Sequence, residues 1–237
     1  MKTKQRSINF RGNYITHALG AIDGVAYTNS LDAFLDNYRQ GCRVFEVDFD
    51  LVDDHLICCH DETMFKRFVG NQDYTYENFM RSKLLGKYTT LDIQGVSQLL
   101  RDYQDIWIIT DTKYSDPESV QKIFSMIKTA CAGNLNRIIP QIYNQAMYQL
   151  VTAVDAFAGM IFTLYQLENW DAQTIADFCV ANDIPMVTMW HYLLNPKVAQ
   201  IFHDHQIKIG THTVNDATVA GNLRQMGCDY FYTDNLK

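Results

Sequence analysis

Eight short segments rich in β-branched and aromatic residues recur along this 237-residue chain, and stretches with helical periodicity separate them. Such alternation is typical of repeated strand–helix units, in which helices cover parallel strands. We place the strands at 14–17, 44–50, 106–111, 137–143, 159–165, 185–190, 208–212 and 229–233. Eight units without a linker rich in proline, glycine or serine predict an α/β protein with a closed (β/α)₈ TIM barrel. An open doubly wound sheet is the alternative, and the number of units makes it less attractive.

Helix boundaries carry their own signals. An apolar stripe at positions i, i+3, i+4 and i+7 begins at Leu31, and Gly41 ends it. Three more helices are expected to begin after the capping residues Asp116, Asn195 and Asp216. In the first two, a proline occupies the first helical position, where its missing N–H costs nothing.

Two features depart from a regular barrel. Residues 61–92 form an aromatic and charged stretch that is too long for an ordinary loop. We interpret it as a small insertion after the second strand that covers the rim of the barrel. The sequence also stops at Lys237, soon after the eighth strand, so we expect the final helix to be missing or short. Residues 1–237 are expected to form a single domain.

Charge and hydropathy limit the classes of partner that this chain can bind. The net charge of −7, with no cluster of lysine and arginine, argues against nucleic acid, whose phosphates need such clusters. No run of about 18 apolar residues occurs, so stable membrane insertion is not expected. The six cysteines show no CxxC spacing, which favours buried reduced thiols, and no apolar signal-peptide core follows the basic first residues. These features predict a cytoplasmic protein, while secretion stays open if a leader was removed, and they leave the oligomeric state open.

Two histidines bracket a pair of carboxylates in the first quarter of the chain: His17 precedes Glu46 and Asp48, and His60 follows them. The carboxylates lie in a segment that alternates like a strand, so they share one face of it. Asp50 has the same register, but we expect it beyond the strand end, at the surface. Carboxylates inside a strand are costly to bury unless they are paired or bound to metal. The histidines could supply the acid and the base at such a metal site.

Later strand ends add further polar groups. Asp111 ends the third strand, and Lys113 follows on the same face. Active sites of such barrels lie at the carboxyl ends of the strands. We therefore expect Asp111 and Lys113 to share one pocket with the two histidines and two carboxylates named above. Five more strand-end residues could shape a substrate pocket: Gln141, Tyr143, Tyr165, Trp190 and His212. The alternatives are ordinary aromatic packing and an internal ion-pair network around Lys113.

The motifs follow a recognisable order: His17, Asn29-Ser30, Glu46-Val47-Asp48, His60-Asp61, Asp111-Thr112-Lys113, Thr213-Val214-Asn215 and Thr233-Asp234. In this order the chain resembles the glycerophosphodiester phosphodiesterase family, and more broadly the phosphatidylinositol-specific phospholipase C-like barrels. The resemblance covers nearly the whole chain. It implies a phosphodiesterase barrel, a hydrolase of lipid metabolism, that cleaves a small glycerophosphodiester-like substrate to a phosphomonoester and an alcohol.

The resemblance also implies a role for each site residue. One divalent cation, Mg²⁺ or Ca²⁺, would be held by Glu46, Asp48 and Asp111, since hard cations prefer oxygen ligands. Two histidines, His17 and His60, would act as general acid and base on opposite sides of the phosphodiester. The remaining cationic group, Lys113, would offset the charge that develops on the phosphoryl oxygens.

Four positions depart from the pattern of the family. Ala18-Leu19 replaces the usual Arg-Gly after the first histidine, Thr28 replaces an acidic residue, and His212 replaces a tryptophan. The missing arginine removes one cation that would contact phosphate. Two alternatives therefore stand beside the hydrolase: a phospholipase-like lyase that forms a cyclic phosphate, and a catalytically impaired barrel that binds a phosphorylated ligand.

Overall fold

The computed structural model describes residues 8–237 and contains a closed barrel of eight parallel strands. These strands are β1 Tyr14–Thr16, β2 Val44–Asp48, β7 Trp107–Asp111, β8 Ile138–Ile142, β9 Ile161–Thr163, β10 Met186–Trp190, β11 Lys208–His212 and β12 Tyr230–Thr233. Each strand pairs with the next in the chain, and β1 closes the barrel by pairing with both β2 and β12. The predicted (β/α)₈ barrel is confirmed, and the open sheet is excluded.

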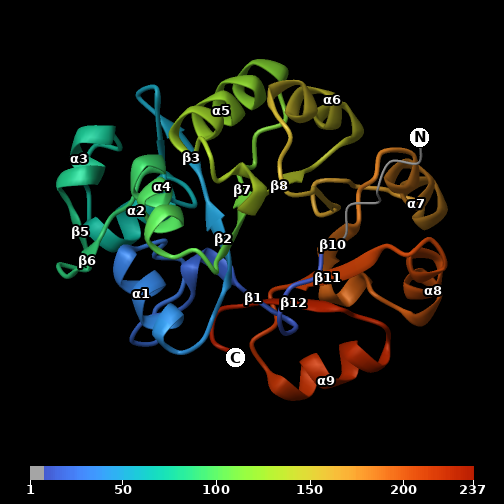
Figure 1. The fold of residues 1–237 in the computed structure, drawn as a ribbon. Helices are drawn as coiled ribbons and strands as arrows, with labels where there is room; N and C mark the ends of the chain where they lie inside the picture. Colours follow the sequence, from blue (N-terminus) through green and yellow to red (C-terminus); the bar gives the residue numbers. More distant parts are fainter. Residues whose placement is uncertain (1–7) are drawn as a thin grey trace.

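Helices surround the barrel, as Figure 1 shows. They are α1 Leu31–Arg39, α4 Ile93–Asp102, α5 Pro117–Ala130, α6 Gln145–Val154, α7 Ala172–Ala181, α8 Pro196–Asp204 and α9 Ala217–Gln225. The predicted capping residues Asp116, Asn195 and Asp216 each accept a backbone N–H in the first helical turn. Three short 3₁₀ turns lie between strands and helices: η1 His17–Leu19, η2 Leu135–Arg137 and η3 His191–Leu193. None of the helices between residues 8 and 237 is long and apolar enough to cross a membrane.

The interior of the barrel has two layers. The lower layer, toward the amino ends of the strands, is apolar, and the upper layer, at their carboxyl ends, is polar. One cluster of buried residues fills the lower layer: Ile8, Ile15, Val44, Ile109, Ile139, Ile161, Met186, Tyr230 and Tyr232. Two residues further along several strands, the side chain on the same face becomes polar, because strand side chains alternate with a period of two. Glu46 follows Val44 in this way, and Asp111 follows Ile109. The strand pattern thus places polar groups at the carboxyl ends, above an apolar floor.

The insertion after β2 begins earlier than predicted. An antiparallel hairpin of β3 Asp50–Val52 and β4 His55–Ile57 comes first. The predicted range then contains α2 Glu62–Val69, α3 Tyr76–Arg81 and the small hairpin of β5 Lys83–Leu84 and β6 Tyr88–Thr89. These elements lie beside α1 in Figure 1. Their aromatic residues form a small core of their own, centred on Phe65 and Phe79.

Asp50 lies beyond the end of β2 and is half-buried, whereas the sequence placed it at the surface. Its carboxylate accepts hydrogen bonds from the hydroxyls of Tyr74, at 2.7 Å, and Tyr114, at 2.6 Å. It therefore fastens the first hairpin of the insertion to the loop after β7, outside the cluster formed by the two preceding carboxylates.

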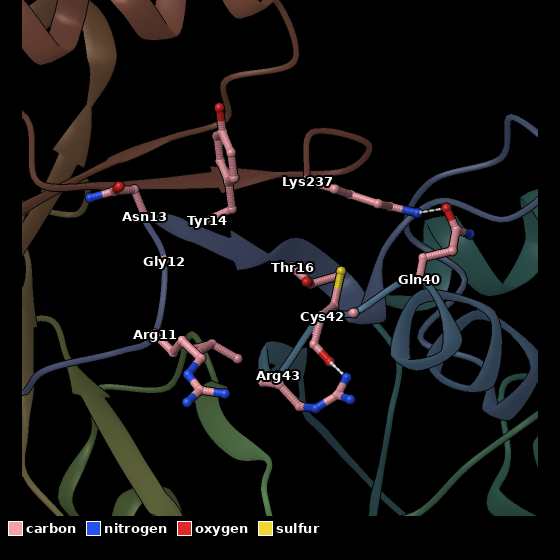
Figure 2. A pocket seen from close by; sticks show the side chains of 11 residues that line it. Arg11, Gly12, Asn13, Tyr14, Thr16, Gln40, Cys42, Arg43 and Lys237 are labelled. Atoms are coloured by element: carbon pink, nitrogen blue, oxygen red, sulfur yellow. Dashed lines mark hydrogen bonds between the residues drawn. The ribbon is translucent and has the colours of Figure 1, made fainter.

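Residues 234–237 form no helix in the described part of the chain, and the outer face of β1 borders a cavity there (Figure 2). Tyr14 and Thr16 line this cavity of about 140 Å³ together with Cys42 and Lys237. The ammonium group of Lys237 donates to the side chain of Gln40 across it. All six cysteines of the protein are free, and five of them are buried.

Candidate active site

Three buried carboxylates meet at the carboxyl ends of β2 and β7. Glu46, Asp48 and Asp111 each offer an oxygen atom, and these three atoms lie within 4.8 Å of one another. The pairing of β2 with β7 sets Asp48 beside Asp111. Such a cluster of negative charges can hold a divalent cation, since carboxylate oxygens are its preferred ligands.

Glu46 is the carboxylate with the least compensation. Its Oε2 accepts a hydrogen bond of 2.7 Å from the backbone N–H of Ala18 in η1. Burial and the neighbouring Asp48 nevertheless raise its pKa to about 8, although the charge of His17 opposes them. A buried carboxylate beside two others favours its protonated form unless a positive charge is supplied.

Asp48 is held on both sides. Asn29 donates to its Oδ2 at 2.9 Å and accepts from its backbone N–H at 3.1 Å. Lys113 binds its other oxygen through Nζ at 2.5 Å. Burial would raise the pKa of Asp48, but Lys113 and the nearby His17 and His60 lower it overall. Asn29 and Lys113 both have a positive φ, of 46° and 59°, a conformation that asparagine tolerates well.

Tyr143 supports Asp111 from behind. Its hydroxyl accepts the backbone N–H groups of Thr112, at 2.7 Å, and Lys113, at 2.9 Å, and it donates to Oδ1 of Asp111. The predicted role of Tyr143 in binding substrate does not fit this position, because the side chain is 1 % exposed and its hydroxyl is fully used. It instead fixes the turn that carries Asp111 and Lys113.

Replacement of Tyr143 by phenylalanine is expected to lower the free energy of unfolding by about 2 kcal/mol, because two buried N–H groups lose their acceptor. Urea unfolding of the purified variant measures this loss. Tyr232→Phe is the matched control. Within residues 8–237 the hydroxyl of Tyr232 makes a single hydrogen bond, to Gln141, and its loss should cost about 1 kcal/mol. Equal effects of the two substitutions would contradict the supporting role of Tyr143.

The two predicted histidines are each oriented by a carboxylate on Nδ1. His17 Nδ1 lies 2.8 Å from Asp234, whose other oxygen accepts from Asn215 at 2.6 Å. His60 Nδ1 lies 2.6 Å from its neighbour Asp61. In both rings the carboxylate leaves Nε2 available for proton transfer.

The imidazole of His17 has a raised pKa. Burial lowers its pKa, but the hydrogen bond to Asp234 and the negative charges of Glu46 and Asp48 outweigh burial and raise the pKa to about 9. Tyr27 lies between the two histidines, with its ring edge-to-face at 4.8 Å from His17 and 5.4 Å from His60. The structure thus brings the two histidines to the same carboxylate cluster.

A small cavity joins these groups to the opposite side of the barrel. It is lined by His17, Glu46, Asp111, Gln141, Thr163, Tyr165, His212 and Tyr232. Three of the predicted substrate-binding residues, Gln141, Tyr165 and His212, therefore face the same space as the carboxylates. Trp190 does not line the cavity but packs against the His212 ring, with 4.5 Å between the ring centroids.

Several site residues had no role in the sequence prediction. The sequence motifs contain Asn29, Asn215 and Asp234 but assign no role to them. Asp234 contacts His17 because barrel closure pairs β12 with β1. The Thr-Asp pair after the last strand is the sequence signal that could have assigned Asp234. For Tyr27, in an irregular loop, we find no such signal.

Solved structures with the same fold include several phosphodiesterases. A phosphodiesterase from Oleispira antarctica, in complex with the product sn-glycerol-3-phosphate, matches with a TM-score of 0.76 and 13% identity over 94% of this chain and 93% of its own. A glycerophosphodiester phosphodiesterase from Parabacteroides distasonis matches with a TM-score of 0.74 and 15% identity, over 98% of this chain and 94% of its own. A glycerophosphodiester phosphodiesterase from Thermotoga maritima matches with a TM-score of 0.67 and 18% identity, over 96% of each chain. The chain has the fold of glycerophosphodiester phosphodiesterases.

No protein-family model matches the chain, and no curated protein matches it significantly. The likeness to these phosphodiesterases is thus one of fold at low sequence identity. Because one barrel fold can carry many activities, the chemistry of this chain has to be argued from its own side chains.

Proposed function

We propose that this protein is a phosphodiesterase that uses one divalent cation, Mg²⁺ or Ca²⁺, to hydrolyse a glycerophosphodiester-like substrate to a phosphomonoester and an alcohol. The observation that carries the proposal is the buried carboxylate cluster flanked by two carboxylate-oriented histidines. The fold supports it, since a phosphodiesterase of the same fold has been solved with sn-glycerol-3-phosphate. Such a reaction would belong to lipid metabolism.

The residues present fit a divalent cation. Three buried carboxylates converge, and burial together with the neighbouring Asp48 raises the pKa of Glu46. Glu46, Asp48 and Asp111 would hold the cation through hard oxygen ligands, as Mg²⁺ and Ca²⁺ require. When bound, the cation would polarise the phosphoryl group and neutralise negative charge on its oxygens.

The other groups of the cluster provide binding and proton transfer. Lys113 carries a positive charge between Asp48 and Asp111, and burial fails to remove this charge because both carboxylates raise the pKa of Lys113 well above its usual value. This ammonium group is placed to contact phosphoryl oxygens, as cationic clamps do. Through their Nε2 atoms, His17 and His60 would share the two proton transfers, one taking a proton from the nucleophile and the other giving one to the leaving alcohol.

Purified protein should hydrolyse glycerophosphodiesters with millimolar Mg²⁺ or Ca²⁺ and should lose this activity when a chelator is added. Release of sn-glycerol-3-phosphate, followed by a coupled dehydrogenase assay, measures the reaction, and ³¹P NMR of the product mixture identifies the phosphorus species. A cyclic phosphate in these spectra would indicate the lyase instead. Binding of a phosphomonoester without turnover under either metal would indicate the impaired binding barrel.

A further inference from the structure

The two sides of the site differ in chemistry. The side formed by β1, β2 and β7 carries the ionised groups, including the carboxylate cluster, His17 and Lys113. The ends of β9, β10 and β11, with the residues that directly follow them, carry aromatic rings instead. We call the four rings Tyr165, Trp190, Tyr192 and His212 the aromatic wall.

The inner cavity is too small for a whole phosphodiester. Its volume is about 30 Å³, which is room for about two water molecules. A phosphoryl group that reaches the carboxylate cluster therefore leaves its alcohol substituents to extend across the rim. The aromatic wall forms part of that rim, since Tyr165 and His212 line the cavity and Trp190 packs against both.

The outer half of the aromatic wall is open to solvent. Trp190 is 37 % exposed and Tyr192 is 69 % exposed, which is high for such large apolar rings. Their planes are within 7° of parallel, with centroids 6.3 Å apart. Exposed aromatic rings beside a polar pocket are the usual anchors of a ligand, because covering them releases water from a large apolar area.

The inner half of the wall carries little charge. His212 has its pKa lowered to about 4 by burial and by the nearby charged His17, so its ring is neutral at physiological pH. The Nε2 atom of His212 is buried and has no hydrogen-bond partner within residues 8–237. A neutral ring with one unused polar atom can accept or donate a single hydrogen bond to a substrate oxygen.

We propose that the aromatic wall binds the alcohol part of the diester and selects alcohols with an apolar surface over polar ones of similar size. The proposal rests on the proposed phosphodiesterase function and names the substrate class of that site. Trp190 and Tyr192 supply the apolar contact, and His212 supplies one hydrogen bond near the ester oxygen.

The geometry of the outer rings favours an uncharged group over a quaternary ammonium. Sites for such cations surround them with several ring faces, so that the electrostatic attraction adds up. Trp190 and Tyr192 are parallel instead, and the neutral ring of His212 beside Trp190 adds no negative charge. On a surface of this kind, apolar contact strengthens the binding of a ligand, whereas a positive charge on the ligand adds little to its affinity.

The test compares glycerol 3-phosphate diesters of four primary alcohols: 2-phenylethanol, 3,3-dimethylbutanol, choline and ethanolamine. Choline and 3,3-dimethylbutanol are matched in shape and differ in charge. We expect the wild-type protein to favour the phenylethyl and dimethylbutyl diesters over the ethanolamine diester by about tenfold in kcat/KM. Trp190→Ala should remove most of this preference by raising KM for the apolar diesters.

Two further variants keep the test decisive. Tyr192→Ala, at the more exposed ring, should weaken the preference partly, and Trp190→Phe should retain it. Val180→Ala, which changes an exposed apolar residue on α7, should leave it unchanged. Hydrolysis of all four diesters without preference, or a preference that survives Trp190→Ala, would overturn the proposal while the phosphodiesterase function stands. A tenfold preference for choline over its uncharged isostere would overturn it in favour of a cation site. Failure to hydrolyse any diester would remove both conclusions.

Discussion

Replacement of Glu46 by glutamine should make the metal-free protein more stable and at the same time abolish its response to divalent cations. Burial and Asp48 raise the pKa of Glu46 to about 8 in the folded state, whereas an unfolded chain releases this proton near a pH of about 4.3. Between these values the folded state binds more protons, so the stability of the metal-free protein falls as the pH rises. Glutamine keeps the acceptor for the Ala18 N–H and removes the charge.

The expected gain is on the order of 2 kcal/mol in the free energy of unfolding at about pH 8, and it should vanish as the pH falls to about 3, where the carboxyl is protonated in both states. Urea unfolding in chelator measures it. In wild-type protein, Mg²⁺ or Ca²⁺ at about 100 times its Kd should raise the free energy of unfolding by about 2.7 kcal/mol. Glu46→Gln should lose this stabilisation by the cation. It should also lose more than about 99% of the hydrolytic activity.

Asp50→Asn is the matched control for Glu46→Gln. Asp50 belongs to the same run of acidic residues, but it accepts hydrogen bonds from Tyr74 and Tyr114 outside the carboxylate cluster. The control should keep the stabilisation by cations. An intact cation response in Glu46→Gln, or loss of the response in both variants, would contradict the assignment of the cluster as the metal site.

Replacement of His17 or His60 by alanine should lower kcat by about 100- to 10,000-fold, because each variant lacks one of the two proposed proton-transfer groups. The alanine variant of His17 also leaves Asp234 without its imidazole partner, although Asn215 still donates to that carboxylate. Steady-state kinetics at saturating cation and substrate measures kcat, and a parallel unfolding curve shows whether the variants are folded.

His205→Ala provides the comparison for these variants. His205 lies at the end of α8 and contacts the carbonyl of Ile201 at 2.8 Å, away from the cluster. Its replacement should leave kcat at the wild-type value. A folded His60→Ala variant with wild-type turnover would show that His60 takes no part in proton transfer.

Much of the fold was readable from local pattern. The capping residues Asp116 and Asn195 with their prolines fixed two helix starts, because a side-chain acceptor and a preset φ act within one turn. The insertion was harder to delimit, since Asp50 continues the alternation of β2 in sequence while its backbone already belongs to a separate hairpin. Periodicity alone does not reveal where a strand changes its partner.

The grouping of the three carboxylates was predictable for a similar reason. Glu46 and Asp48 share a face by strand periodicity, and β2 pairs directly with β7, so Asp111 joins them. The role of Tyr143 could not be read in this way. Whether a strand-end tyrosine meets substrate or the backbone behind a neighbouring loop depends on side-chain direction and packing, which its sequence position does not encode.

The sequence by itself determined the barrel, its apolar floor and the carboxylates above it, because these follow from the two-residue period of strands and from the short capping signals of helices. Only the tertiary structure decided which groups hold these carboxylates and the histidines in place. Asn29 reaches Asp48 from a loop, and Asp234 reaches His17 from the far end of the chain. Such contacts arise when the barrel closes, since closure brings together residues whose separation in sequence carries no local signal.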